Sequence, residues 1–275
     1  MSAGVVERYP EIDEVVAYIH QNLYEPLPLS RLAGYAAYSP YHFTRIFKER
    51  IGLSPLYYVS ALRLQKAKDL LLQTNLSIRD VGMEIGQQSL GTFTTRFTER
   101  VGVTPAEFRR SSLHAESVIH SLRSLDDWEV PNMPSLGCGV IEGNIQSTVP
   151  FDGFILIGLF ARPIPEGFPL YGTLLPSVGR FRFTDVKPGT YYLMATSVTW
   201  GMRTVDFMLP HATLRTRTHL PLTVQPGRPV PYQEVMLHTA RQDDPPILVS
   251  LPLLMHNFLN RAGADAGKAS GTIRM

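Results

Sequence analysis

The first 110 residues of the chain contain a pattern that returns after fifty positions. The pattern is Ser-x3-Phe-x3-Phe-x-Glu-x2-Gly-x2-Pro-x2-aromatic. Its two copies lie at Ser39, Phe43, Phe47, Glu49, Gly52, Pro55 and Tyr58, and at Ser89, Phe93, Phe97, Glu99, Gly102, Pro105 and Phe108. Matches at a single offset indicate a duplicated supersecondary unit. We therefore expect the N-terminal part to fold as two similar units.

Each copy has the signals of one helix followed by the start of another. A serine N-cap and a proline in the first turn begin a helix, and a glycine C-cap ends it. The two phenylalanines are one turn apart and share a buried face. A shorter helix is predicted before each copy, over 30–36 with Ser30 as cap and over 77–85 with Ser77 as cap. A short helix, a tight turn and a longer helix with a polar outer face make a helix-turn-helix.

A third type of helix is predicted between the two units, from Leu56 to Gln73. At about 1.5 Å per residue it would span about 27 Å, comparable to the ~34 Å that separates successive major-groove segments of DNA. Its cationic residues Arg63, Lys66 and Lys68 could approach phosphates, but a solvated face of this helix is the preferred interpretation.

The composition changes near residue 112, from helical periodicity to alternating aromatic and β-branched residues broken by Pro and Gly. We predict two domains, an all-α double helix-turn-helix followed by a mainly antiparallel β-sandwich. The expected boundaries are 1–112 for the DNA-binding domain, 113–144 for a connecting helix and linker, 145–262 for the β-sandwich and 263–275 for a disordered tail. The linker signal is strongest over 131–137.

Strands in the second domain are expected over 154–160, 179–186, 189–193, 205–209, 219–224 and 232–238, with a helix near 251–260. In the strand-turn-strand signal over 179–193, Phe181, Phe183 and Val186 are expected to face the core, with the turn at Pro188 and Gly189.

Several classes of function lack support in the sequence. No apolar run approaches the ~20 residues of a membrane span, and no signal peptide is visible, so a cytoplasmic protein is expected. The single cysteine, Cys138, excludes an internal disulfide and a multi-cysteine zinc site. The histidines lack metal-ligand spacing, and no catalytic motif appears, so neither metal, cofactor nor enzymatic activity is expected. The net charge of +2 requires any DNA-binding charge to be local.

The repeated pattern resembles the DNA-binding domain of the AraC/XylS family of transcription regulators. The matching residues include Leu32-Ala33, both copies of the repeat, Arg63-Leu64-x2-Ala67-x2-Leu70-Leu71, and Ile78-x2-Val81-x3-Ile85-Gly86. The resemblance covers about residues 10–112. It implies binding to double-stranded DNA through recognition helices Ser39–Arg50 and Ser89–Arg100. It also implies RNA polymerase as a partner, and it is compatible with a homodimer or a small-molecule effector.

The candidate DNA contacts are the outward-facing residues of the two recognition helices. They are Tyr41, His42, Thr44, Arg45 and Lys48 on the first helix, and Leu90, Gly91, Thr94, Thr95 and Arg96 on the second. Arg45 carries a guanidinium suited to a guanine edge, whereas Lys48 and Arg96 suit phosphates. The second unit departs from the family pattern at Gln87, where an aromatic residue is usual, and at the small or apolar residues of its recognition helix.

The segment 179–193 resembles a strand-turn-strand signature of transthyretin-like, carboxypeptidase-regulatory-type β-sandwiches. This resemblance leaves the role of the second domain open between effector sensing and dimerisation. An alternative function for the whole chain is an enzyme or carbohydrate-binding module in which the β domain is primary.

Overall fold

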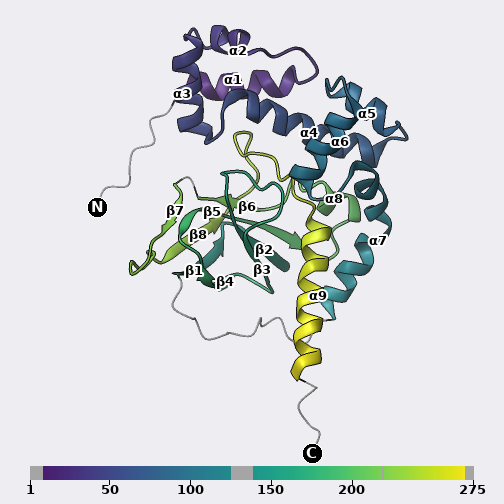
Figure 1. The fold of residues 1–275 in the computed structure, drawn as a ribbon, viewed down its shortest axis with the longest axis vertical. Coiled ribbons are helices and arrows are strands. Elements are labelled where there is room, and N and C mark those ends of the chain that lie inside the picture. The colour runs from purple at the N-terminus through teal and green to yellow at the C-terminus, as the bar shows by residue number, and fades with distance from the viewer. Residues whose placement is uncertain (1–8, 125–138, 219, 270–275) are drawn as a thin grey trace, which may run out of the picture. The chain divides into compact units, whose positions relative to one another are not determined.

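The computed structural model describes residues 9–124, 139–218 and 220–269 (Figure 1). The helices are α1 (Pro10–Gln21), α2 (Leu29–Tyr35), α3 (Pro40–Ile51), α4 (Pro55–Gln73), α5 (Ile78–Glu84), α6 (Leu90–Val101), α7 (Pro105–Arg123), α8 (Thr204–Met208) and α9 (Leu251–Ala269). The strands are β1 (Gly139–Ser147), β2 (Gly153–Phe160), β3 (Tyr171–Leu175), β4 (Gly179–Val186), β5 (Gly189–Thr199), β6 (Arg215–Arg217), β7 (Leu222–Val224) and β8 (Gln233–Leu237).

The predicted helix-turn-helix pairs are α2–α3 and α5–α6, and most of their predicted end signals are confirmed. Ser39 accepts a hydrogen bond from the backbone N–H of His42, and Ser77 accepts one from Asp80. Gly52 ends α3 in the left-handed region, at φ 84°. Ser30 is not a cap, because α2 begins one residue earlier and follows Pro28. The prediction failed there because Pro28 already places the chain in the extended conformation that precedes a helix.

The two turns have the same hydrogen bonds at equivalent positions. The N–H of Tyr38 donates to the carbonyl of Ala33 at 2.9 Å, and the N–H of Gln87 donates to that of Gly82 at 2.9 Å. The residue before each donor has a positive φ, 55° at Ala37 and 80° at Gly86. The glycine of the second turn is visible in the sequence pattern, whereas nothing in the sequence indicates a left-handed alanine in the first.

The helix α4 confirms the predicted spacer helix, but the prediction for one of its cations is wrong. Lys68 has no exposed surface, so it does not belong to a solvated face. Arg63 donates to the carbonyls of Leu23 and Glu25, at 3.1 and 2.7 Å. Burial lowers the pKa of Arg63. These two cations of α4 therefore bind backbone carbonyls of the protein.

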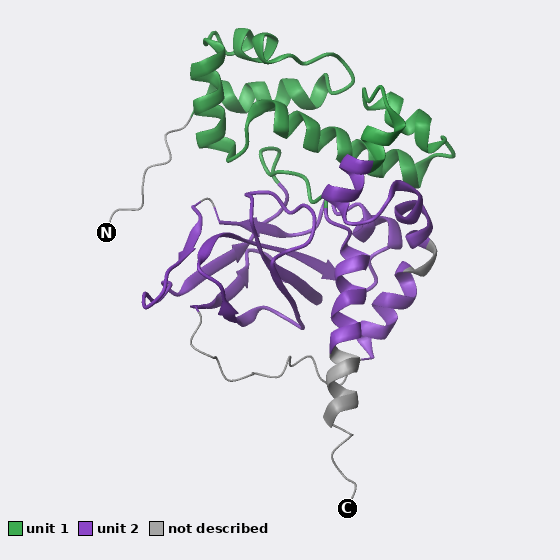
Figure 2. Cartoon of the chain, viewed as in Figure 1, with its two compact units in different colours: residues 1–94, 241–248 green, residues 95–240, 249–275 purple. Residues whose placement is uncertain are grey.

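The chain divides into two compact units that differ from the stretches expected from composition (Figure 2). Unit 1 contains residues 1–94 and 241–248, and unit 2 contains residues 95–240 and 249–275. The division falls within α6. In unit 2, α7 packs against α8 and α9.

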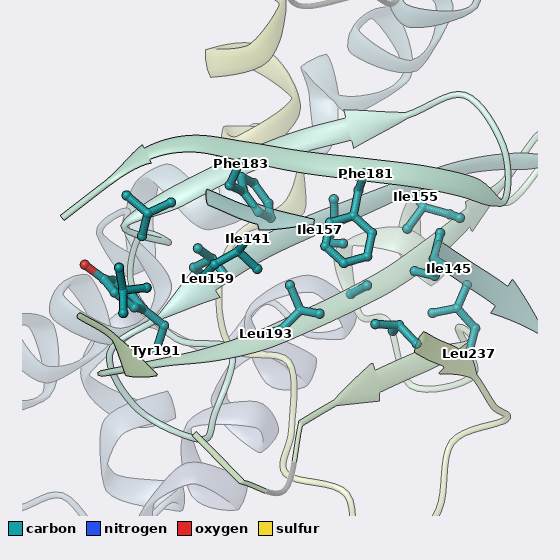
Figure 3. Close-up of a cluster of buried hydrophobic side chains, with 14 of the residues drawn as sticks. Ile141, Ile145, Ile155, Ile157, Leu159, Phe181, Phe183, Tyr191, Leu193 and Leu237 are labelled. Atoms are coloured by element: carbon teal, nitrogen blue, oxygen red, sulfur yellow. The ribbon is translucent and has the colours of Figure 1, made fainter. Parts of the chain in front are cut away.

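Unit 2 contains two sheets. One has the strand order β4-β1-β8, and the other has the order β3-β2-β5-β6 with β7 also paired to β5. Among the described strands the pairs are antiparallel, except that β1 runs parallel to β8. Buried side chains from both sheets form one cluster and point toward one another in Figure 3.

The hairpin over residues 179–193 forms as β4 and β5. Phe181, Phe183 and Val186 are all buried in the cluster, as predicted, although simple alternation would turn Val186 outward. The register between β1 and β4 shifts at this point, and Asp185 has φ 55°. An irregularity of this kind adds a residue to one strand and restores the inward direction.

Three other predictions for the C-terminal half were wrong. Residues 205–209 were predicted as a strand but lie mainly in α8, where the adjacent residues Phe207 and Met208 are both buried, a pattern that alternation does not give. The strand β1 begins at Gly139, inside the predicted linker, because its two glycines weaken the strand signal. The helix α9 spans Leu251–Ala269 and is longer than the helix predicted near 251–260. The linker signal at 131–137 lies outside the described residues.

Candidate nucleic-acid interface

The first candidate recognition helix, α3, has one buried face and one exposed face. Phe43 and Phe47 are fully buried, with ring centroids 5.5 Å apart. Tyr41, Arg45 and Lys48 lie on the opposite side and are exposed, Tyr41 to 85%. We call these three residues the reading face of α3. The spacing of the phenylalanines therefore fixes which side chains of α3 are available to a partner.

The other two predicted contacts on α3 are half-buried and have partners within the protein. The ring of His42 lies edge-on to Tyr38, with centroids 4.8 Å apart. The hydroxyl of Thr44 donates to the carbonyl of Pro40 at 2.8 Å. Tyr38 in turn donates to Glu11, which lowers the pKa of that carboxyl group. His42 is thus held at the start of α3 through contacts that extend to α1.

Arg45 has a partner that a ligand can displace. Its guanidinium lies 3.5 Å from the carboxylate of Glu49, and the two side chains are 56% and 53% exposed. An exposed pair of this type contributes about 0–1 kcal/mol and is screened by salt. Exchanging Glu49 for a phosphate or a guanine edge is therefore energetically accessible to Arg45.

The helix α6 repeats this arrangement with different chemistry. Phe93 and Phe97 are buried, as their counterparts are in α3. Of the predicted contacts, Leu90, Gly91, Thr95 and Arg96 are exposed, and Thr94 is half-buried. Gln88 and Thr92 are also exposed, and Thr92 lies three positions before Thr95 on the same face. The sequence prediction omitted Thr92, although its helical spacing could have identified it.

In each helix-turn-helix pair, the short helix packs closely against the recognition helix at one equivalent position. Ala33 of α2 is buried, and Gly82 occupies the corresponding position of α5. A Cβ atom added to Gly82 would lie 3.1 Å from Cδ1 of Phe93. A small residue is therefore needed where the short helix meets the phenylalanine of the recognition helix.

The described part of the chain contains no group of three or more His, Cys, Asp or Glu residues that could hold a metal ion. It also contains no helix that is long and apolar enough to cross a membrane.

Comparison with known proteins places this geometry in a family. Residues 32–111 match the family described as "Helix-turn-helix domain". The chain is 33% identical over 109 residues to the transposon Tn10 TetD protein of Escherichia coli, covering 40% of this chain and 79% of that one. It is 36% identical over 114 residues to the bifunctional transcriptional activator/DNA repair enzyme AdaA of Bacillus subtilis, covering 40% of this chain and 54% of AdaA.

Solved structures include similar chains. One is a transcriptional regulator with an AraC-type DNA-binding domain from Chromobacterium violaceum, 33% identical, with a TM-score of 0.36 and coverage of 37% of this chain and 91% of that one. Another is the DNA-binding domain of AdpA in complex with a target DNA, 27% identical, with a TM-score of 0.37 and coverage of 39% and 96%.

The capped, duplicated helix pairs and the family match define a helix-turn-helix DNA-binding protein. More specifically, the chain belongs to the AraC family of transcription regulators. The chain spans about half the length, or less, of the first curated relatives it matches.

Proposed function

We propose that this regulator reads a specific DNA sequence with α3 and α6 placed in successive major-groove segments, and that α3 dominates the choice of sequence. The observation that carries this proposal is the reading face of α3, where a tyrosine, an arginine and a lysine are exposed opposite a buried phenylalanine pair. A guanidinium can pair bidentately with guanine, which discriminates by ~1–3 kcal/mol. The residues that we propose to contact DNA all lie within residues 1–112.

The proposed asymmetry follows from the side chains on α6. Leu90, Gly91 and Thr95 offer an apolar contact, a backbone or a hydroxyl, and such groups discriminate weakly between bases. Arg96 is the cation on this helix that we assign to phosphate, because it neighbours the buried Phe97 instead of lying at the centre of the exposed stripe. Phosphate contacts orient the protein and carry no direct sequence information.

The test compares three variants on two duplexes. A DNA duplex is first selected by the full chain from a random-sequence pool, and a scrambled duplex of the same composition serves as reference. At one fixed salt concentration, Arg45→Ala is expected to weaken binding to the selected duplex by roughly ten-fold or more and to relax the preference at one position. Thr95→Ala is expected to have much less effect. Arg96→Ala is expected to weaken binding to both duplexes about equally.

Two results would contradict the proposal at different levels. Equal losses of sequence preference for Arg45→Ala and Thr95→Ala would mean that α6 reads bases as deeply as α3. Failure to select any duplex would argue against sequence-specific binding by this chain. Whichever helix reads the sequence, DNA binding is expected to weaken steeply with rising salt, because phosphate neutralisation dominates the affinity.

For the C-terminal region we infer a β-sandwich that serves dimerisation or effector sensing. The buried cluster contributed by both sheets supports face-to-face packing. Because bulky side chains such as Phe181, Tyr191 and Leu193 fill this interior, the same cluster favours protein contact over a ligand cavity between the sheets. We further propose a cytoplasmic location and RNA polymerase as a partner, both from family membership.

Sedimentation and thermal shifts separate these two roles. A concentration-dependent dimer that is insensitive to small molecules would support dimerisation. A compound that raises the melting temperature without changing the mass would support sensing.

A further inference from the structure

Residues 241–248 follow β8 in the C-terminal half of the sequence, but they belong to unit 1 with the first helix-turn-helix (Figure 2). We call this segment the strap. Its second half, 245–248, is buried. A short loop that only connected two elements would instead run over the surface. The strap is thus part of the packing of unit 1.

The strap binds the ammonium group of Lys68 on α4. This side chain is fully buried, and its Nζ donates to the carbonyls of Ile247 at 2.9 Å and Leu248 at 3.3 Å. A buried charge is costly unless hydrogen-bond acceptors surround it. These two acceptors come from the strap, so an ordered α4 depends on a segment some 180 residues later in the chain.

The strap also holds the last turn of α3. Arg50 donates to Asp243 at 2.8 Å and pairs with Asp13 of α1 at 2.9 Å, and its side chain is only 18% exposed. Burial raises the pKa of Asp243, but the hydrogen bond and charge of Arg50 outweigh that effect and lower it overall. Arg50 therefore joins α1, the candidate recognition helix and the strap.

A third set of contacts lies between these two. The carbonyl of Gln242 accepts a hydrogen bond from the hydroxyl of Tyr58 at 3.1 Å and lies 3.2 Å from Nε2 of His20. Tyr58 is fully buried and is the aromatic residue that closes the first copy of the repeat. The strap, which lies outside the repeat, thus contacts side chains of α1, α3 and α4.

The residues that follow the strap, beginning with Val249, belong to unit 2. In unit 2, the N–H of Val249 donates to the carbonyl of Pro165 at 3.0 Å, and the N–H of Ser250 donates to that of Val101 at 2.9 Å. Val101 is the last residue of α6. Within unit 2, the backbone of residue 250 is therefore bound at the C-terminal end of α6.

We propose that the strap, residues 241–248, forms a positioning element for DNA reading, in which Asp243 fixes the C-terminal turn of α3 through Arg50. This inference rests on the proposed roles of α3 and α6. It makes Arg50 a positioning residue, because its guanidinium is engaged by Asp13 and Asp243. It also makes the C-terminal half a required part of the first helix-turn-helix.

The test uses the full chain and the selected and scrambled duplexes described above. Asp243→Asn is expected to weaken binding to the selected duplex by roughly three- to ten-fold, the effect of losing one partly buried charged hydrogen bond, with a smaller loss on scrambled DNA. Asp243→Glu keeps the charge and should recover most of the affinity. The matched control is Asp206→Asn, which removes an aspartate–arginine pair of the same 2.8 Å length at α8, between Arg203 and Asp206.

A second comparison needs no DNA. Amide hydrogen exchange at the end of α3 should be faster in Asp243→Asn than in Asp206→Asn. On α4, Lys68→Met should accelerate exchange in the strap, whereas Lys66→Met, whose ammonium lies over the ring of Tyr24, should not.

The outcomes distinguish this inference from the proposed function. If the native chain binds and Arg45→Ala loses preference, but Asp243→Asn behaves like its control in affinity and exchange, the positioning element is wrong and the proposed function stands. Tighter binding by Asp243→Asn would also overturn the inference, because the strap would then mask α3 instead of positioning it. If no duplex is selected, the proposed function fails, and unchanged exchange at the end of α3 refutes the strap separately.

Discussion

The two turns of the repeat predict opposite effects for exchanging alanine and glycine. Ala37 and Gly86 hold equivalent positions, and both have a left-handed backbone, at φ 55° and 80°. A left-handed conformation costs an L-residue about 1–2 kcal/mol, while glycine loses about 0.4–1 kcal/mol more entropy on folding than alanine. Ala37→Gly should therefore stabilise the first turn, and Gly86→Ala should destabilise the second, each by about 1 kcal/mol.

Steric contact does not change the sign at Gly86. An added Cβ would lie 3.7 Å from Nη1 of Arg63, which is ordinary van der Waals contact. Gly34 provides a control, because it lies inside α2 and its added Cβ would have no neighbour within 4 Å. Gly34→Ala should stabilise α2 by up to about 1 kcal/mol through helix propensity alone.

Native-state hydrogen exchange is the suitable assay, because it reports the opening free energy of each turn separately and does not require the whole chain to unfold in one step. Peptides that cover α2–α3 and α5–α6 are compared in the three variants. The reasoning is refuted if Gly86→Ala protects its turn as well as Gly34→Ala protects α2, or if Ala37→Gly loses about 1 kcal/mol of protection.

Three further predictions follow from the contacts of single side chains. The side chain of Thr104 accepts a hydrogen bond from the N–H of Glu107 in a capping box, whereas Ser54 at the equivalent position makes no side-chain cap bond. Thr104→Ala should therefore lower the free energy of unfolding in urea by about 1 kcal/mol, and Ser54→Ala should lower it much less. Phe181→Ala should destabilise unit 2 by about 3–5 kcal/mol, because it leaves a cavity in the core. Arg182→Ala, on the exposed face of the same strand, should change the stability little, so similar urea midpoints for the two variants would contradict the core assignment. Because the pKa of Asp243 is lowered, its contribution is present above about pH 4, the ordinary range of the carboxyl group, and is lost as the pH falls through the folded pKa. The melting temperature should therefore change less between pH 7 and pH 3 for Asp243→Asn than for the native chain.

The local features of the N-terminal half were predictable because their causes lie within a few residues. The cap at Ser39, the left-handed Gly52 and the buried Phe43 and Phe47 each depend on neighbours in the same helix or turn. The exposure of Tyr41 and Arg45 followed from the same spacing. A periodic pattern is sufficient wherever one face of a helix is apolar and the other is polar.

The features that could not be predicted depend on contacts with residues far away in the sequence. The burial of Lys68 could not be predicted, because its acceptors at Ile247 and Leu248 come from another part of the chain. Arg50 gave no signal either, since an arginine in the last turn of a helix is ordinary and its partner is Asp243. A sequence feature that marks this segment is the pair of prolines at 245 and 246, beside two acidic residues and an apolar run.

The same distinction explains why the motif ends near residue 110 while the compact units divide elsewhere. The repeat identifies residues by local spacing, but a helix is stabilised mainly by the surface that its apolar face contacts. In unit 2, the N–H of Ser250 donates to the carbonyl of Val101 at the end of α6 at 2.9 Å, and Arg100 of α6 pairs with Glu166. The helix α7, which follows α6, packs against α8 and α9. In unit 1, side chains of α3 and α4 bind the strap. Each recognition helix is therefore supported by residues that follow the motif, so a fragment that ends at residue 112 keeps every helix-turn-helix signal but loses part of the packing for both helices.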